Sequence, residues 1–293
     1  MNRTVESAEF HDLTIERFND FTILSGIEPA YYSSLAPFRE YFRTGLPILT
    51  YHKLGSRPRG ARLKGLYLSP ELFNRQLAEL SEAGFKSTDL DSIGGSGGNE
   101  KTNQIIITFD DGFQSVLEYG LGPLREHGFR AIQFIVADRI GERNDWDVSV
   151  GEVPEALMSK EQIRDWLAAG HQIGSHSRTH PLLTRLSADR AREEIAASKK
   201  KLEDMFGVEV RHFCYPYGDW NPVVRDLTEA AGYKSACTTQ FGVHIPGESL
   251  FALKRITARY RSRNWKTFRK WCSSWIGRKW GIGRSDKVGK RGM

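Results

Sequence analysis

The chain has 293 residues, and its 39% hydrophobic and 27% charged residues are typical of a soluble, core-forming protein rather than a disordered or fibrous one. It contains no apolar run near the eighteen or so residues that a transmembrane helix needs, and we see no secretory signal at its start. The net charge of +6 is uneven: residues 254–293 hold fourteen Lys and Arg against one Asp, whereas the preceding residues are net acidic, which argues against a basic body that binds nucleic acid.

The first 45 residues are mixed polar and aromatic without a strong period, and we expect them to form an N-terminal extension. From residue 46, short apolar stretches alternate with amphipathic stretches that end in glycines and begin at capping residues. The expected strands are 47–51, 104–109, 131–136, 171–175, 211–215 and 234–238. The expected helices are 70–84, 113–127, 159–169, 187–206 and 221–231.

This repeated alternation predicts a parallel sheet with helices outside it. Six or seven strands in roughly 210 residues suit a slightly small β/α barrel better than a short open sheet, and in such a barrel functional groups follow the C-terminal ends of the strands. We divide the chain into the extension 1–45, a barrel domain 46–260 and a basic, Trp-rich tail 261–293.

Two adjacent carboxylates, Asp110 and Asp111, end the apolar strand 104–109. Burying a carboxylate costs several kcal/mol unless it is paired or binds a metal, so this pair is a candidate functional site. The alternative is structural: Asp111 caps the helix 113–127, and Asp110 stays in solvent. This segment alone favours the two interpretations about equally.

Two histidines four residues apart, His176 and His180, follow the strand 171–175. Neutral imidazole is the commonest zinc ligand, although such pairs also occur by chance on many surfaces. Pro181 argues against a shared regular helix, so the two imidazoles would converge through a loop. With one carboxylate they make the His2Asp set of an open hydrolytic metal site, which leaves the second carboxylate as a general base.

Three further positions are weaker candidates. The turn 213–218 (FCYPYG) can present a backbone N–H to a developing oxyanion, or it is an ordinary aromatic-lined turn. His52, after the first strand, is a candidate general acid, although a lone histidine there is more often hydrogen-bonded structure. Trp146, after the strand 131–136, is as suited to packing on a helix as to stacking on a sugar ring.

Together, TFDD (108–111), HSRTH (176–180) and FCYPYG (213–218) resemble, in order and spacing, the NodB-type polysaccharide deacetylases of carbohydrate esterase family 4. The resemblance covers roughly residues 46–260. It implies a distorted (β/α)7-type barrel, the NodB-homology deacetylase fold, and metal-dependent N-deacetylation of acetylated amino sugars.

The resemblance also implies roles for individual residues. Asp110 would be the catalytic base, and the metal ligands would be Asp111, His176 and His180. Tyr217 would supply the oxyanion N–H. The opening segment 47–52 resembles a permuted branch that includes poly-N-acetylglucosamine deacetylases, in which the acid histidine lies on the first strand, and His52 takes that role. We expect Trp146 and Tyr215 to contact the substrate.

The chain departs from the family's usual pattern at two places. Cys214 stands where most members have an Arg that tethers the base, an Arg that the permuted branch also lacks. The late Leu-x-His motif is absent, and Leu253-Lys254-Arg255 stands near its place. His244 is the other late histidine and a weaker candidate for the acid than His52. The sequence therefore leaves open what orients Asp110.

We expect a metal-dependent hydrolase that removes N-acetyl groups from an amino-sugar polysaccharide or oligosaccharide. Zinc is the default metal, and cobalt or nickel also suit the ligand set. The alternatives are deacetylation or deformylation of a lipid-linked sugar precursor, and a catalytically silent barrel that binds glycan. The sequence does not indicate the particular glycan or the oligomeric state.

The basic tail carries an amphipathic stretch at 264–280. Its apolar helical face is formed by Trp265, Phe268, Cys272, Trp275 and Ile276. A terminal helix docked on the barrel is the favoured interpretation, and an interfacial helix on an anionic membrane is the alternative. Because three scattered cysteines suit a reducing compartment and no signal is seen, we expect a cytoplasmic location or one at the inner face of the membrane.

Overall fold

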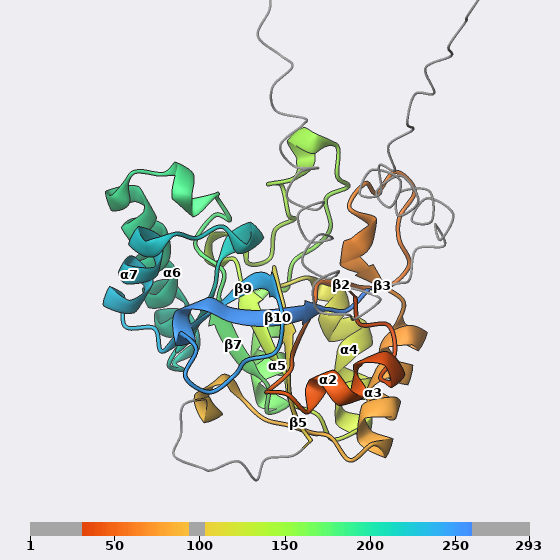
Figure 1. Ribbon diagram of the computed structural model, residues 1–293. Helices are drawn as coiled ribbons and strands as arrows, with labels where there is room; N and C mark the ends of the chain where they lie inside the picture. Colours follow the sequence, from red (N-terminus) through yellow and green to blue (C-terminus); the bar gives the residue numbers. More distant parts are fainter. Residues whose placement is uncertain (1–30, 94–102, 260–293) are drawn as a thin grey trace, which may run out of the picture. The chain divides into compact units, whose positions relative to one another are not determined.

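Seven parallel strands close into a barrel in the computed structural model, which describes residues 31–93 and 103–259 (Figure 1). The barrel order is β1-β5-β6-β7-β8-β9-β10, and β1 closes it by pairing with both β5 and β10. The strands are β1 (Ile48–Tyr51), β5 (Gln104–Phe109), β6 (Ile132–Ile135), β7 (Gln172–Ser175), β8 (His212–Cys214), β9 (Ser235–Phe241) and β10 (Leu253–Thr257). The predicted α/β barrel is confirmed.

Six of these strands lie where the sequence predicted them, whereas β10 was not predicted. The five residues of β10 include Lys254 and Arg255, so they form no continuous apolar run of the kind expected for a buried strand. Arg255 is nevertheless buried, and its side chain points into the barrel toward β5. Short strands lie beside the barrel: β2 (Lys53–Leu54) pairs with β3 (Tyr67–Leu68), and β4 (Lys86–Ser87) pairs with β5.

Two helices begin at the capping serines that the sequence predicted. Ser69 Oγ accepts the N–H of Leu72 at the start of α3, and Ser159 forms a reciprocal capping box with Gln162 at the start of α5. The α-helices are α2 (Arg39–Phe42), α3 (Pro70–Glu82), α4 (Gln114–Glu126), α5 (Lys160–Ala168), α6 (Ala188–Phe206) and α7 (Pro222–Ala230). The 3₁₀ turns are η1 (Ala36–Phe38), η2 (Lys64–Leu66), η3 (Leu90–Ser92), η4 (Ala137–Arg139), η5 (Val148–Val150), η6 (Leu183–Arg185), η7 (Pro216–Gly218) and η8 (Leu250–Ala252).

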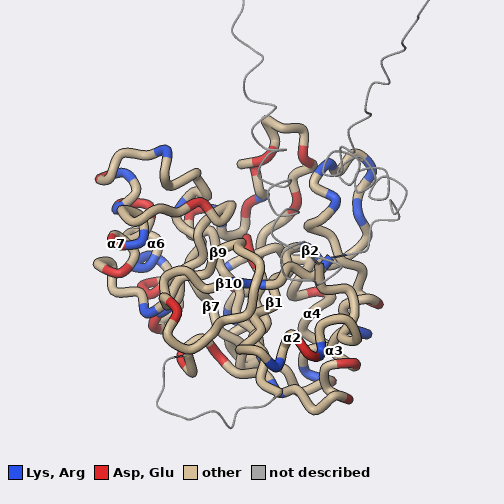
Figure 2. The backbone as a smooth tube through the Cα atoms, in the orientation of Figure 1, with Lys and Arg blue, Asp and Glu red and all other residues tan. Residues whose placement is uncertain are grey.

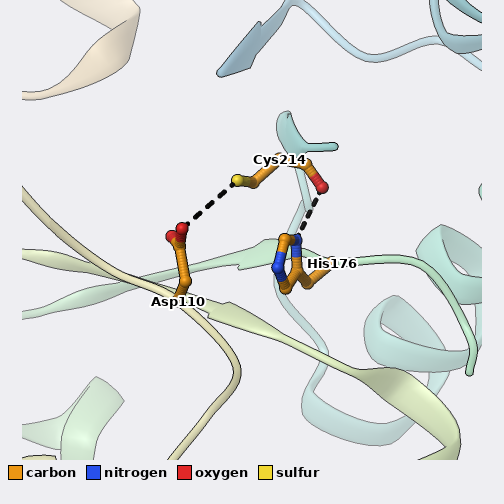
Figure 3. Close-up of side chains that lie close together, drawn as sticks. All are labelled: Asp110, His176 and Cys214. Carbon is orange, nitrogen blue, oxygen red and sulfur yellow. Dashed lines mark hydrogen bonds between the residues drawn. The ribbon is translucent and has the colours of Figure 1, made fainter. Parts of the chain in front are cut away.

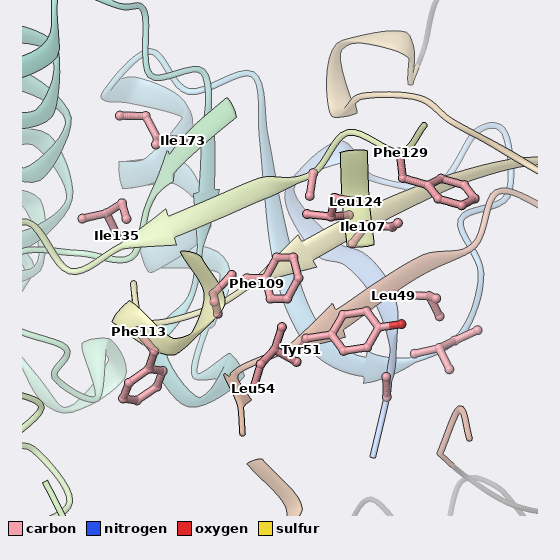
Figure 4. Packing of buried hydrophobic residues seen from close by; sticks show 14 of the residues in the cluster. Leu49, Tyr51, Leu54, Ile107, Phe109, Phe113, Leu124, Phe129, Ile135 and Ile173 are labelled. Atoms are coloured by element: carbon pink, nitrogen blue, oxygen red, sulfur yellow. The ribbon is translucent and has the colours of Figure 1, made fainter. Parts of the chain in front are cut away.

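Alternate residues along each strand face opposite sides of the barrel wall, which divides the core into two clusters. The larger cluster lies between wall and helices and includes Leu49, Tyr51, Ile107 and Phe109 (Figure 4). The smaller cluster is formed by the residues that face the other side of the wall, and it includes Ile48, Ile106, Ile132, Phe134, Cys214, Cys237 and Leu253. Charged residues concentrate on outer helices such as α6 and α7 (Figure 2).

Part of the predicted N-terminal extension packs on this core. The rings of Tyr32, Phe38 and Phe42 contact one another, and the backbone N–H of Tyr32 donates to the carbonyl of Thr257, the last residue of β10. The boundary at residue 45 stays a prediction. The tail, with its stretch 264–280, lies outside the described residues. None of the helices in the described ranges is long and apolar enough to cross a membrane.

Candidate metal centre

The two adjacent carboxylates lie at the C-terminal end of β5, inside the barrel mouth. Asp110 and Asp111 are 2% and 5% exposed. The backbone of Asp111 is left-handed (φ 75°), as is that of Gly112 (φ 84°), so the chain turns sharply before α4. Phe113 is the N-cap residue of α4, without a side-chain cap. The alternative in which Asp111 caps the helix and Asp110 stays in solvent is therefore wrong, since both carboxylates are buried at the barrel mouth.

Asp111 and the two histidines form a compact set of buried donors. The Nε2 atoms of His176 and His180 each lie 3.3 Å from Oδ1 of Asp111, and all three side chains are buried. A tetrahedral zinc ion with ligand bonds of about 2.0–2.1 Å separates its ligands by about 3.3–3.4 Å. The three donors therefore fit one divalent cation, and the structure does not indicate which one.

A hydrogen bond at Nδ1 fixes the orientation of the His176 ring. Its Nδ1 lies 2.7 Å from the carbonyl oxygen of Cys214, a contact that requires a proton on Nδ1 and aims Nε2 at Asp111. Burial raises the pKa of Asp111, but hydrogen bonds from His176 and His180 outweigh burial and hold that pKa well below its ordinary value. The carboxylate is thus ionised, as a metal ligand must be.

A second buried cluster, Asp110 with His176 and Cys214, overlaps the first (Figure 3). Figure 3 shows the Cys214 thiol facing Asp110 while the Cys214 carbonyl faces His176. Burial raises the pKa of the Cys214 thiol to about 11, so it stays protonated near neutral pH, whereas metals bind the thiolate. The set of Asp111, His176 and His180 is the better metal site.

Arg255 on β10 holds Asp110 in place. Its Nη1 and Nη2 donate to Oδ1 and Oδ2 of Asp110 at 2.8 and 2.7 Å, a bidentate pair. The same guanidinium donates to the Thr238 carbonyl (2.9 Å), the Thr108 hydroxyl (3.1 Å) and the Cys214 sulfur (3.1 Å). All five of its N–H donors are used, so this side chain has a single well-defined position.

This pair sets the charge of Asp110. Burial raises the pKa of Asp110, but the Arg255 guanidinium more than offsets burial, and the pKa lies below its ordinary value. The sequence left the orientation of Asp110 open because Cys214 replaces the usual Arg. The tether comes from a different strand, and only the position of Arg255 near the missing Leu-x-His motif hinted at it.

His52 also lies beside the Asp110 carboxylate. Its Nε2 is 3.8 Å from Oδ2 of Asp110, and its side chain is 18% exposed, which leaves it accessible from the barrel mouth. Burial lowers the pKa of His52, against the opposing pull of the Asp110 and Asp111 carboxylates. The weaker candidate, His244, pairs through its backbone with Leu46, just before the start of β1, and therefore lies at the opposite end of the barrel.

Aromatic residues surround His180. The ring of Trp146 stacks on the imidazole with centroids 4.5 Å apart, and the ring of Tyr217 meets it edge-on at 4.5 Å. The hydroxyl of Tyr217 donates to the buried carboxylate of Asp147 at 3.2 Å. Tyr217 has a left-handed backbone (φ 57°). Trp146, Asp147 and Tyr217 therefore form one wall of the site.

Tyr215 lies elsewhere. Its side chain is fully buried, and its hydroxyl donates to the Phe251 carbonyl at 3.1 Å. It supports the turn beneath Tyr217 and offers no surface to a substrate, against our expectation. Sequence reasoning also passed over Glu194, a buried carboxylate of α6 that contacts the loop between the two histidines.

Comparisons with known proteins agree with this geometry. The family model described as polysaccharide deacetylase matches residues 97–236. A Bacillus subtilis protein named "Putative polysaccharide deacetylase YxkH" is 26% identical over 72% of this chain and 70% of its own length. Both comparisons show a similarity to polysaccharide deacetylases, which for the family model covers residues 97–236. The peptidoglycan-N-acetylglucosamine deacetylase PgdA of Listeria monocytogenes is 34% identical over 43% of this chain, which spans only 24% of that protein.

Solved structures of polysaccharide deacetylases have the same barrel. One from Bacillus cereus superposes with a TM-score of 0.63 at 26% identity, covering 78% of this chain and 68% of its own. IcaB from Ammonifex degensii gives a TM-score of 0.64 over 78% of this chain and 97% of its own, at 22% identity, which is a likeness of fold. Several curated relatives are named as carbohydrate deacetylases, which are hydrolases of amide bonds, among them PgdA and chitin deacetylase 1 of Cryptococcus neoformans.

Proposed function

We propose that the chain is a metal-dependent N-deacetylase of an acetylated amino-sugar glycan. The observation that carries this proposal is the paired arrangement at the end of β5. Asp110 is held ionised by Arg255, and Asp111 beside it faces two imidazoles at 3.3 Å. A base next to an open ligand set is what metal-assisted amide hydrolysis requires.

Asp111, His176 and His180 would hold a divalent cation, zinc by default, which when bound polarises the acetyl carbonyl and lowers the pKa of a water. Asp110 takes the proton of the attacking water, and the Arg255 pair keeps its carboxylate ionised and aimed for that task. The backbone N–H of Tyr217 donates to the oxyanion that forms at the carbonyl. His52 gives a proton to the leaving amine nitrogen.

The position of His52 supports the permuted branch of the family for this chain. The residue follows β1, and its Nε2 lies 3.8 Å from Asp110, within reach of a substrate placed between them. The segment 253–255, where the ordinary branch carries its late histidine, instead supplies Arg255. The acid and the tether of the base therefore come from the two strands, β1 and β10, that close the barrel.

The substrate is an N-acetylated amino sugar, by analogy with relatives named for N-acetylglucosamine and chitin deacetylation. Trp146 supports this assignment, since its ring stacks on His180 at the barrel mouth and is partly exposed, so it can stack on a sugar ring. A catalytically silent barrel is disfavoured, because all four residues of the base and ligand set are present and in register.

The direct experiment measures acetate released from N-acetylglucosamine oligomers by the purified chain, after chelation and after zinc is restored. We expect no acetate after chelation and recovery with about one zinc per chain. Zinc binding without acetate would contradict the assigned substrate and point to another acylated sugar. A chain that neither binds zinc nor releases acetate would favour the silent glycan-binding barrel.

A further inference from the structure

Glu194 is a buried carboxylate that the proposed chemistry does not use. It lies on α6 and is 5% exposed, which is unusual for a glutamate unless its oxygens are satisfied. Its hydrogen-bond donors all come from one place, the three residues between the two histidines of the candidate metal centre.

The contacts fix the backbone of that loop. Oε2 of Glu194 accepts the N–H of Arg178 at 3.0 Å and the N–H of Thr179 at 2.9 Å, and Oε1 accepts the Thr179 hydroxyl at 2.8 Å. The loop's carbonyls are held from the opposite side, since the carbonyls of Ser177 and Arg178 accept the N–H groups of Ala137 and Asp138. Every one of these backbone groups therefore has a fixed partner.

The loop needs this support because its backbone is strained. Ser177 and His180 both have left-handed conformations, with φ of 63° and 66°, which cost energy for residues that carry a Cβ. The φ of His180 determines where its imidazole points. Without the buried carboxylate, two N–H groups in the middle of the loop would lose their acceptor, and a relaxed backbone would carry His180 away from Asp111.

We propose that Glu194 is a positioning residue for the metal centre: it clamps the backbone of Arg178 and Thr179 so that the imidazoles of His176 and His180 converge on Asp111. This inference rests on the proposed function only in taking those three residues as metal ligands. Outer contacts that orient ligands typically contribute 10- to 100-fold to metal affinity.

Substitutions of Glu194 can separate the effect of its side-chain length from the effect of its charge. In Glu194→Gln the amide oxygen can still accept both N–H groups, and the amide nitrogen can donate to the Thr179 hydroxyl. Glu194→Asp keeps the charge but is one methylene too short to reach both N–H groups, and Glu194→Ala removes the acceptor. The neighbouring Glu193 is the matched control, because its carboxylate bonds only to the side chains of Arg178 and Arg190, at the surface.

The experiment measures zinc affinity of the full chain by competition with a chromophoric chelator, with the visible spectrum of bound cobalt as the report of ligand geometry. We expect Glu194→Ala to weaken zinc binding about 10- to 100-fold. The zinc affinity of Glu194→Asp should lie between those of Glu194→Ala and Glu194→Gln. Glu194→Gln should bind zinc within a few-fold of the wild type, and the affinity of Glu193→Ala should be unchanged. A purely structural role would lower the melting temperature without moving the affinity of the folded protein or the cobalt spectrum.

Wild-type zinc affinity in a folded Glu194→Ala variant would overturn the proposal. If that variant does not fold, the zinc affinities of Glu194→Asp and Glu194→Gln are compared instead, and equal affinities would overturn the proposal. A wild-type chain that binds no zinc would instead refute the metal centre itself, and a chain that binds zinc but releases no acetate leaves this test intact.

Discussion

At the scale of single residues, Arg255 shows how the Asp110 carboxylate is held in place when Cys214 stands where most family members have an Arg. A guanidinium on β10 reaches the same carboxylate from another strand and uses all five donors in doing so. Cys214, at the position of the usual Arg, becomes a small buried neighbour that accepts one of those bonds. The cation that holds the Asp110 carboxylate thus comes from β10.

Replacing Arg255 should therefore change both the stability and the pH profile. Arg255→Met leaves Asp110 buried without its cation, and we expect the free energy of unfolding to fall by about 3–5 kcal/mol. Because Arg255 holds the pKa of Asp110 below its ordinary value, its loss lets burial raise that pKa, and the acidic limb of kcat/KM should move to higher pH.

Denaturant titration and a pH–rate profile measure the two effects. Cys214→Ala is the control, since it keeps the ion pair and should leave the acidic limb in place. An Arg255→Met enzyme with the wild-type pH profile would show that Arg255 does not set the charge of Asp110.

At the scale of elements, the loop that carries Trp146 and Asp147 is fixed by a buried charge cluster. Lys53 of β2 is 1% exposed and lies 3.4 Å from Glu152 and 3.2 Å from Glu155. Glu152 also accepts the N–H groups of Arg62 and Leu63, at 2.8 and 2.7 Å. Burial raises the pKa of Glu152, but these N–H groups and Lys53 bring it below its ordinary value, so it stays ionised.

Removing the cation of this cluster should loosen the wall of the site. We expect Lys53→Met to lower the free energy of unfolding by about 3 kcal/mol, because the buried carboxylate of Glu152 and the partly exposed one of Glu155 lose their cation. KM for the glycan should rise more than kcat falls, since the loop bears Trp146 and no member of the base and ligand set. Lys200→Met, which breaks an exposed pair with Asp204, should change stability by less than about 0.5 kcal/mol. Equal effects of the two variants would contradict this account.

Most of the elements could be predicted because their signals are local. The apolar run 104–109 and the caps Ser69 and Ser159 depend on neighbouring residues alone, and the strands and helices formed there. The strand β10 and the role of Arg255 could not be predicted, because a buried arginine is stabilised by a carboxylate 145 residues away. The contacts of Glu194 with the loop between the two histidines could not be predicted either, because the neighbouring residues of its own helix do not indicate them.

At the scale of the whole molecule, the barrel explains why the candidate residues meet. All seven strands are parallel, so the residues that follow β1, β5, β7 and β8 share one rim, although they are far apart in the chain. The smaller apolar cluster includes residues of the same strands, and Arg255 of β10 donates to Thr108 of β5 and to Asp110, which follows it. The candidate site thus lies at one end of the closed barrel.

The measurement that tests the central claim most directly compares Asp110→Asn with His176→Ala, for zinc content and acetate release in the same preparations. We expect Asp110→Asn to keep about one zinc per chain and to lose turnover by at least about 100-fold, since it lacks the base but none of the ligands. His176→Ala should lose both zinc and turnover. Full turnover by Asp110→Asn, or tight zinc binding by His176→Ala, would contradict the assignment of base and ligands.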